Sequence, residues 1–162
     1  MTQLRPKRHA EETPLPGARI LLIEARYEEA ICDELLAGAL ARLEAAQVEI
    51  KHIRVSGALE IAVAAAILLD AAQKSGNPFD GLVALGCVIR GETAHFDIVA
   101  GESARALMDL AVARRLPVGN GILTVENEAQ AFARAKRSEG DKGGEAASAA
   151  LALVRLARAG AK

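Results

Sequence analysis

Two kinds of hydrophobic pattern alternate along this chain. Short apolar runs or strict apolar–polar alternation predict four strands, at residues 18–25, 48–55, 82–88 and 118–125. Apolar residues at helical spacing predict helices at about 28–46, 58–74 and 97–113, another starting after Asn127, and a long Ala- and Leu-rich helix closing the sequence. This alternation indicates an α/β fold with a parallel sheet covered by helices on both faces.

Local signals support several of these elements. In the first helix, five apolar residues fall on one face: Ile31, Leu35, Leu36, Ala39 and Leu43. Asn127, with Gln130 three residues later, resembles a capping box at the start of the fourth helix. That helix runs into the polar stretch 136–144, which is typical of a solvated loop.

The first 16 residues differ from the rest of the chain. They are polar and end in Pro14-Leu15-Pro16, so we predict an N-terminal arm outside the core. Residues 17–162 are predicted to form a single domain, because 162 residues suffice for one sizeable hydrophobic core. The start of the chain is too polar for a signal peptide, and no apolar run approaches the length of a membrane span.

Composition narrows the function classes. Apolar residues make up 51% of the chain but aromatic residues only 2%, so the core must be built from Ala, Leu, Val and Ile. A net charge of −1 gives no electrostatic surface for nucleic acid or for an anionic membrane. Cys32 and Cys87 lie far apart in sequence and have no metal-binding or redox spacing. We therefore expect a cytoplasmic protein without a metal site.

The segment 86–95, Gly-Cys-Val-Ile-Arg-Gly-Glu-Thr-Ala-His, carries the strongest candidate chemistry. It follows the third predicted strand, and open α/β sheets bind ligands at the carboxyl ends of their strands. We expect Thr93 to be the N-cap of the next helix, and a cap with free backbone N–H groups is also an anion site. His95 is suited to general acid or base catalysis, although a solvated or backbone-bonded histidine fits the sequence equally well.

Other candidate residues carry weaker signals. Tyr27, the sole tyrosine, is expected at the end of the first strand, where its ring can stack on a heterocycle or pack at the edge of the core. Glu60 lies at the start of the second helix, and capping is the simpler role for it. Gly119 and Gly121 within the fourth strand indicate close approach of a ligand or a backbone. The sequence has no Walker loop and no dinucleotide fingerprint, which argues against a nucleotide-binding protein.

Three motifs together resemble the lumazine synthase family of riboflavin biosynthesis. They are Ser56-Gly-Ala-Leu-Glu-Ile61, Gly86-Cys-Val-Ile-Arg-Gly-Glu-Thr-Ala-His-Phe-Asp97 and Gly121-Ile-Leu-Thr-Val-Glu-Asn127, and the resemblance extends from about Ala18 to the last helix. It implies a three-layer, flavodoxin-like sandwich with a four-stranded parallel sheet. It also implies a homopentamer with active sites between subunits, and no cofactor or metal. The implied reaction joins 5-amino-6-ribitylaminouracil and 3,4-dihydroxy-2-butanone 4-phosphate into 6,7-dimethyl-8-ribityllumazine, releasing phosphate and water.

The resemblance also assigns roles by position in the motifs. His95 would transfer protons. The pyrimidine and its ribityl chain would contact Tyr27, Ala58, Leu59, Glu60, Cys87, Val88, Ile89 and, from the adjacent subunit, Asn120. The phosphate would be held by Glu92, Thr93, Arg134 and Lys142, although from sequence alone a run of solvated charges is the favoured interpretation of Arg134 and Lys142. Riboflavin synthase is the partner protein that the family suggests.

Some positions depart from the family pattern. Leu59 and Asn120 stand where many relatives carry an aromatic residue, so contact with the heterocycle is expected to differ. The polar run 136–142 lacks the usual small, Gly-rich form, which argues against a sixty-subunit capsid. Two rival functions use the same scaffold: a non-catalytic flavin- or lumazine-binding protein, and a pentameric shell protein. The presence of Thr93, His95 and Arg134 together favours the enzyme.

Overall fold

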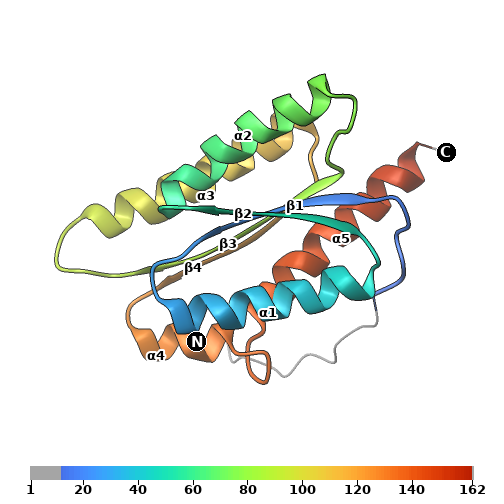
Figure 1. The fold of residues 1–162 in the computed structure, drawn as a ribbon. Helices are drawn as coiled ribbons and strands as arrows, with labels where there is room; N and C mark the ends of the chain where they lie inside the picture. The colour runs from blue at the N-terminus through green and yellow to red at the C-terminus, as the bar shows by residue number, and fades with distance from the viewer. Residues whose placement is uncertain (1–11, 162) are drawn as a thin grey trace.

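The computed structural model describes residues 12–161, which form a four-stranded sheet between two layers of helices (Figure 1). The strands are β1 (Arg19–Ala25), β2 (Glu49–Val55), β3 (Gly81–Ile89) and β4 (Val118–Val125). The helices are α1 (Glu29–Ala45), α2 (Ala58–Lys74), α3 (His95–Arg114), α4 (Glu128–Ala135) and α5 (Lys142–Gly160). The elements predicted from the hydrophobic pattern are confirmed, with shifts at some boundaries.

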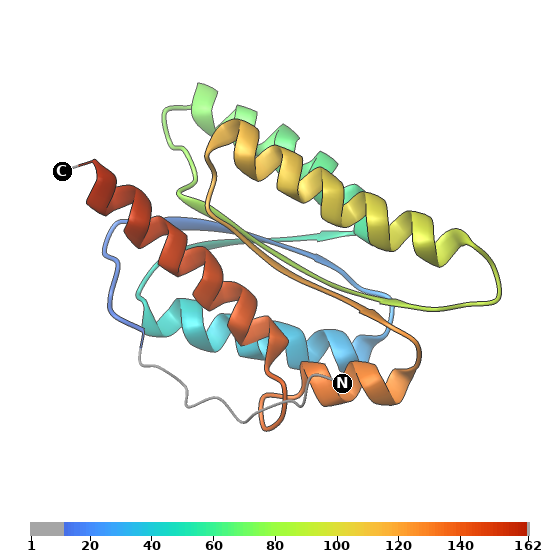
Figure 2. The ribbon, with the colours of Figure 1, turned by 180° about the vertical axis from the view of Figure 1, so that it is seen from behind.

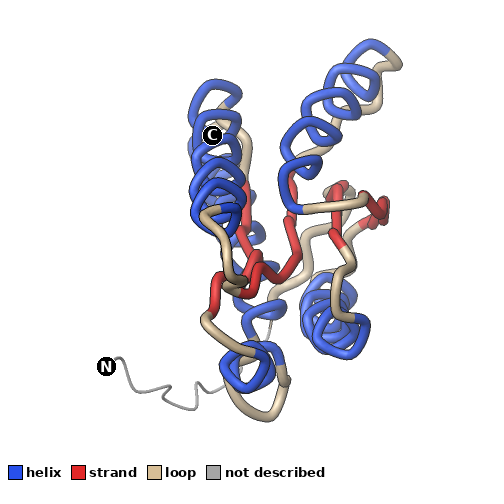
Figure 3. The backbone as a smooth tube through the Cα atoms, turned by 90° about the vertical axis from the view of Figure 1, so that its left-hand side faces the viewer, coloured by secondary structure: helices blue, strands red, loops and turns tan. Residues whose placement is uncertain are grey.

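All neighbouring strands of the sheet run parallel, in the order β2-β1-β3-β4. Helices α2 and α3 cover one face, and α1, α4 and α5 cover the other (Figure 1 and Figure 2). The view in Figure 3 shows the strands between the helices. The expected three-layer, flavodoxin-like α/β sandwich is confirmed. Because the strands are parallel, the segments that follow β1, β2 and β3 lie at one edge of the sheet.

The core has two halves, one on each face of the sheet. Strand β1 shows the division, because successive side chains of a strand point to opposite faces. Ile20 and Leu22 pack in the cluster formed with α1 and α5, whereas Leu21 and Ile23 pack in the cluster formed with α2. All four side chains are fully buried. Strand β2 lies at the sheet edge, and its exposed and half-buried residues explain its polar alternation in the sequence.

Two glycines let α5 pack backbone to backbone against its neighbours. A Cβ atom on Gly119 of β4 would lie 1.8 Å from the carbonyl oxygen of Ala146 in α5. A Cβ atom on Gly143 of α5 would lie 1.9 Å from the carbonyl oxygen of Leu35 in α1. The close approach predicted at Gly119 is therefore that of a backbone, not of a ligand. Helix α5 contacts β4 and α1 without intervening side chains at these points.

Two helices begin earlier than the sequence pattern predicts. Helix α3 starts at His95, and α5 starts at Lys142, inside the stretch interpreted as a solvated loop. The N-cap of α5 is Asp141, whose carboxylate accepts the N–H of Gly144 at 3.3 Å. Asp141 has a left-handed backbone (φ 44°), is 6% exposed and lies 3.5 Å from Arg42. The interpretation as a solvated loop is wrong for the end of this stretch, because capping and an ion pair bury it.

The predicted N-terminal arm falls partly outside the described residues, which begin at Glu12. Glu12 pairs with Arg155 of α5 at 3.1 Å. The backbone N–H of Leu15 donates to the carbonyl oxygen of Ala46 at 2.8 Å, and the Leu15 side chain belongs to the core. The expectation that this segment stands outside the core is wrong for Leu15, because moving its apolar side chain out of water lowers the free energy of the folded state. The domain boundary at residue 17 stays a prediction.

Candidate active site

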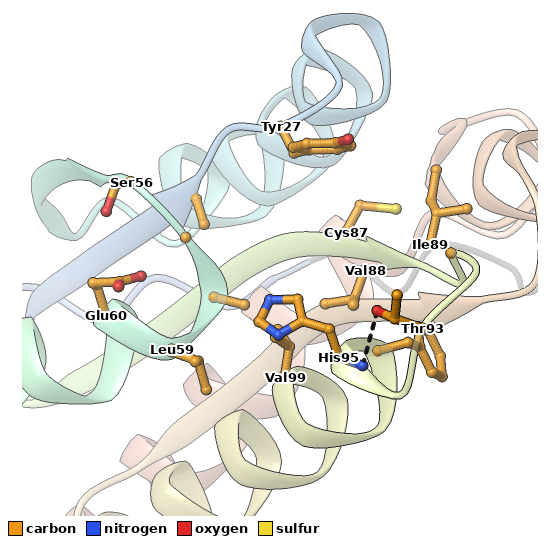
Figure 4. Close-up of a pocket in the computed structure, with 15 residues that line it drawn as sticks. Tyr27, Ser56, Leu59, Glu60, Cys87, Val88, Ile89, Thr93, His95 and Val99 are labelled. Carbon is orange, nitrogen blue, oxygen red and sulfur yellow. Dashed lines mark hydrogen bonds between the residues drawn. The ribbon is translucent and has the colours of Figure 1, made fainter.

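A cavity of about 490 Å³ opens at the edge of the sheet where β1 and β3 end. Four segments surround it: the β1–α1 loop with Tyr27, the start of α2 with Glu60, the end of β3 with Val88, and the start of α3 with His95 (Figure 4). These segments are distant in sequence and meet because the strands are parallel. The volume falls within the range of about 300–1,000 Å³ typical of small-molecule sites.

Most of the residues predicted for the site line this cavity. They are Tyr27, Ala58, Leu59, Glu60, Cys87, Val88, Ile89, Thr93 and His95. The other predicted residues, which do not line it in the described chain, are Glu92, Asn120, Arg134 and Lys142.

The start of α3 fixes the position of His95. His95 is the first residue of the helix and is exposed, and Figure 4 shows its ring directed across the cavity toward α2. The hydroxyl of Thr93 accepts the backbone N–H of His95 at 3.3 Å. The N-cap is Ala94, so the prediction that Thr93 is the N-cap is wrong by one position. The imidazole and the hydroxyl nevertheless reach the same cavity from one turn.

Arg90 holds the turn that precedes α3. Its guanidinium donates to Glu126, just after β4, at 2.8 Å and to Asp97, in the first turn of α3, at 3.4 Å. It also lies 4.2 Å from the ring centre of Phe96, close enough for a cation–π contact. The hydrogen bond that Arg90 donates to Glu126 is the main cause that raises the pKa of Arg90. The turn that carries Thr93 is thus connected to both β4 and α3.

Tyr27 and Glu60 approach the cavity from two other segments. Tyr27 is 77% exposed, so the alternative that it packs at the edge of the core is wrong for this chain. Glu60 lies in the first turn of α2, where a Cβ atom on Gly57 would be 2.8 Å from its Oε2. The negative charge of Glu60 is favourable at the N-terminus of α2. Figure 4 shows that the Glu60 carboxylate also lies at the cavity. Stabilisation of the helix and contact with a ligand are therefore compatible for Glu60.

Cys87 forms an apolar part of the cavity wall. It is 7% exposed, and Cys32 of α1 is also buried; both are free thiols. Burial, with smaller contributions from Cys32 and Glu28, raises the pKa of Cys87 to about 12. Because the thiolate is the reactive form, Cys87 is a neutral side chain at physiological pH and is not suited to act as a nucleophile there.

We expect native Cys87 to resist alkylation by iodoacetamide at about pH 8.5, where an ordinary thiol is half ionised. The pKa of Cys87 is higher in the folded than in the unfolded state, so the folded state favours the protonated thiol. The contribution of this preference to stability is fully present below about pH 8.5. That contribution is lost as the pH rises through about 12. Mass spectrometry after a short pulse of reagent measures the modification, with the urea-unfolded chain as the control. Equal labelling of native and unfolded Cys87 would contradict the prediction.

Glu92 and Asn120 lie outside the cavity in different ways. Glu92 is exposed on the turn that also carries Thr93. Asn120 lines a second groove, of about 400 Å³, formed by α3, β4 and α5. Its side-chain oxygen accepts the N–H of Ile122 at 2.9 Å. To contact a ligand in a cavity of this kind, Asn120 would have to reach the cavity of a neighbouring chain, as the resemblance implies.

Arg134 and Lys142 flank the loop between α4 and α5. Arg134 is half-buried and donates to the carbonyl oxygen of Gln130, one turn earlier in α4, at 3.0 Å. The ammonium of Lys142 lies 2.5 Å from the carboxylate of Glu145 in α5. Neither cation lines the cavity of its own chain, so their roles at a phosphate stay predictions.

Several residues of the cavity were not predicted from the sequence. They are Ala25, Ser56, Gly57, Gly91, Phe96 and Val99. Ser56 and Gly57 open a motif that the sequence analysis had already identified. Val99 lies four residues after His95 and therefore on the same face of α3, a spacing that could have indicated it.

The polar side chains that the chain itself offers to a ligand in this cavity are the imidazole of His95, the carboxylate of Glu60 and the hydroxyls of Tyr27, Ser56 and Thr93. Within residues 12–161, no group of three or more His, Cys, Asp or Glu side chains is arranged to hold a metal ion. None of the helices in that part of the chain is long and apolar enough to cross a membrane.

Comparison with known proteins identifies the family. Residues 17–158 match the family model described as 6,7-dimethyl-8-ribityllumazine synthase. The 6,7-dimethyl-8-ribityllumazine synthase of Azorhizobium caulinodans is 60% identical over 162 residues, covering 100% of both chains. That of Xanthobacter autotrophicus is 65% identical over 144 residues, covering 89% of this chain and 87% of the relative. That of Rhodopseudomonas palustris is 54% identical over 162 residues, covering 100% and 99%. The chain belongs to the 6,7-dimethyl-8-ribityllumazine synthase family.

Proposed function

We propose that this protein is a lumazine synthase, an enzyme of the transferase class. It condenses 5-amino-6-ribitylaminouracil with 3,4-dihydroxy-2-butanone 4-phosphate to 6,7-dimethyl-8-ribityllumazine, phosphate and water, in riboflavin biosynthesis. The observation that carries this proposal is the cavity in which Tyr27 of the β1–α1 loop meets Thr93 and His95 of the turn that opens α3. Membership of the family supports it.

The two-substrate condensation tests this function directly. The purified protein is mixed with both substrates, and lumazine formation is followed by absorbance. Steady formation of lumazine is the expected result. Binding of lumazine or flavin without any turnover would instead indicate the non-catalytic binding protein, and would refute the proposal.

The pyrimidine substrate fits the part of the cavity between Tyr27 and the end of β3. The exposed ring of Tyr27 provides a face on which a heterocycle can stack. Residues 58–60 and 87–89 line the adjoining walls, where their backbone groups can bind the pyrimidine and the ribityl hydroxyls. In the proposed assembly Asn120 of the adjacent subunit completes this end of the site.

The reaction requires the protein to transfer protons, and it does not require a nucleophilic side chain. The amine of the pyrimidine attacks the ketone carbonyl, and water leaves as an imine forms. Phosphate is then eliminated, and the enol that results tautomerises to a new ketone. The second amine attacks this ketone and closes the ring with loss of a second water. Holding both substrates side by side supplies much of the rate, because it replaces an encounter between molecules with a reaction inside one complex. His95 moves protons between the attacking nitrogen and the departing hydroxyl, which is the role of a general acid and base.

The phosphate end of the site is assigned to the turn before α3. The free N–H groups at the start of a helix favour an anion, and Thr93 adds a hydroxyl donor there. In the proposal, Glu92 contributes its backbone, and Arg134 and Lys142 contribute positive charge. These groups stabilise the phosphate in the bound substrate and as it leaves.

Replacing Arg134 with alanine should raise KM for the phosphate substrate by about tenfold, because a charge-assisted hydrogen bond is lost. KM for the pyrimidine should change much less. Steady-state kinetics with each substrate varied in turn measures both values. Arg137→Ala, at an exposed arginine on the adjoining loop, is the matched control and should leave both constants unchanged. If Arg134→Ala raised KM equally for the two substrates, the assignment of Arg134 to the phosphate site would be wrong.

Exposed apolar side chains support self-association. Large hydrophobic residues lie exposed on three helices: Val63 and Ile67 on α2, Ile98, Met108 and Val112 on α3, and Leu153 and Leu156 on α5. Apolar surface of this kind usually marks contact with another protein. We propose a homopentamer whose sites lie between subunits, with riboflavin synthase as a candidate partner. Light scattering on the purified protein measures the mass of the assembly, and a monomeric mass would contradict this part of the proposal.

We also assign the enzyme to the cytoplasm. Cys32 and Cys87 are both free thiols, a state that is maintained in reducing compartments. The small phosphorylated and polar substrates of the proposed reaction are consistent with the same location.

A further inference from the structure

A buried carboxylate lies immediately before the loop that carries Tyr27. Glu24, the second-last residue of β1, is 1% exposed. It accepts hydrogen bonds from Arg26 at 3.1 and 3.2 Å, from Arg54 at 3.0 Å, and is 2.9 Å from Nε2 of His52. Arg54 stands opposite Glu24 in the neighbouring strand β2. A charge this deeply buried must be paired, and here positively charged side chains surround it.

Arg26 connects this carboxylate to α1. Its side chain is only 10% exposed. Nη1 donates to Glu24, while Nε and Nη2 donate to Glu29 at 3.0 and 2.6 Å, and Nη2 also donates to Asp33. Glu29 and Asp33 belong to the first part of α1. One planar guanidinium therefore joins the end of the strand to the start of the helix, across the loop formed by residues 26–28.

Tyr27 is the next residue after Arg26, and its ring has little else to hold it. Strand β1 ends at Ala25 and α1 begins at Glu29, so Tyr27 lies in the short connection between them. Its 77% exposure means that no core packing fixes the side chain. Figure 4 shows the ring at the rim of the cavity, on the opposite side from His95. The position of the ring therefore depends on the backbone of a loop whose conformation is set by Arg26.

We propose that Arg26 is a positioning residue that holds Tyr27 in place as the stacking wall of the pyrimidine pocket. This proposal rests on the proposed function for the identity of the ligand. Arg26 itself is bonded to three carboxylates and does not line the cavity. Its bonds to strand and helix order the loop before the substrate arrives, so that binding does not have to order it.

The first experiment compares Arg26→Gln with Arg54→Gln. Both changes remove hydrogen bonds to Glu24, two in Arg26→Gln and one in Arg54→Gln, but only the first releases the loop. We expect Arg26→Gln to raise KM for the pyrimidine about fivefold with little change in kcat, a partial loss of what stacking on an aromatic ring contributes. Arg54→Gln should behave like the unmodified enzyme. Equal increases in KM for the two variants would overturn the proposal, because the cause would then be the lost partners of Glu24 and not the released loop.

A spectroscopic readout follows the ring without any substrate. The chain contains one tyrosine and no tryptophan, so all of its tyrosine emission comes from Tyr27. Time-resolved anisotropy should show a ring of restricted motion in the unmodified protein and a freer ring in Arg26→Gln. Unchanged anisotropy refutes the positioning role. A protein that forms no lumazine refutes the proposed function instead, so the two failures are distinguishable.

A double-mutant cycle tests whether Arg26 acts through Tyr27. Once Tyr27→Ala has removed the ring, the further change Arg26→Gln should leave KM for the pyrimidine unchanged. An additional increase in that background would overturn the proposal.

The change Arg26→Gln also leaves Glu24 with fewer partners, which can prevent folding. The double variant Glu29→Gln/Asp33→Asn avoids this, because it alters only exposed acceptors on α1 and leaves the bond between Arg26 and Glu24 intact. It should give a smaller increase in KM and the same direction of change in anisotropy. If this folded variant changes neither, the proposal is wrong.

Discussion

Replacing His95 with alanine should lower kcat by about 10²- to 10⁴-fold, the usual contribution of a positioned general acid or base. His95 begins α3, faces the cavity and stands across it from Tyr27. His95 is the one histidine that lines the described cavity, and imidazole is the side chain best suited to giving and taking protons near neutral pH. KM for each substrate should remain close to the value of the unmodified enzyme, because the residue is not required to hold either of them.

Two further measurements separate proton transfer from a structural role of His95. His95→Asn keeps a polar side chain of similar reach but cannot exchange protons at neutral pH, so it should be as slow as the alanine variant. Added imidazole should restore part of the turnover of His95→Ala, since it supplies the missing base in solution. Full activity in His95→Asn would show that a hydrogen bond suffices, and the general acid–base role would be wrong.

Replacing Gly119 with alanine should lower the melting temperature by roughly 10 °C, corresponding to about 3 kcal/mol for a domain of this size. The added methyl group would lie 1.8 Å from the carbonyl oxygen of Ala146, which is too close for two heavy atoms that are not bonded to each other. Helix α5 cannot move away freely, because Gly143 holds it equally close to Leu35 of α1. The strain must therefore be taken up by shifting a strand or a helix of the core.

A matched control for this change lies in the neighbouring strand. In Gly86→Ala the new Cβ atom would lie 3.7 Å from the side chain of Ile122, an ordinary van der Waals distance. Its melting temperature should stay close to that of the unmodified protein. Both variants are compared by calorimetry at one protein concentration, because self-association shifts apparent stability. Similar melting temperatures for Gly119→Ala and Gly86→Ala would contradict the backbone contact with α5.

The hydrophobic pattern predicted the layers of the fold, because buried helices and buried strands each have a characteristic spacing of apolar residues in the sequence. The continuous apolar run of β1 and the spaced apolar residues of α1 are local signals that tertiary contacts only reinforce. The start of α5 was missed for the opposite reason. Asp141 caps the helix by accepting the N–H of Gly144, and it is buried beside Arg42, which lies 99 residues earlier in the chain. A local pattern of glycines and charges does not contain that contact.

The site could be predicted to a similar extent. Residues close together in a motif, such as Cys87 and His95, were found because one turn carries them to the end of β3. The contacts that hold the site in place were not found. Glu24 looks like one polar position in an apolar strand, and Arg26 like a loop charge, until the fold brings β2 and α1 beside them. Asn120 lines a different groove of its own chain, so its proposed role at the cavity depends on a neighbouring chain, which no local sequence pattern contains.

The backbone contacts of α5 also bear on the order in which the molecule can form during synthesis. The ribosome releases every strand before α5, yet α5 contributes much of the cover over β3, β4 and the flank of α1. Until Gly143 reaches Leu35 and Ala146 reaches Gly119 of β4, the apolar side chains on that face remain exposed to water or bound to a chaperone. The nascent chain therefore cannot complete its core one strand at a time, and its folding is completed only after translation of the last helix.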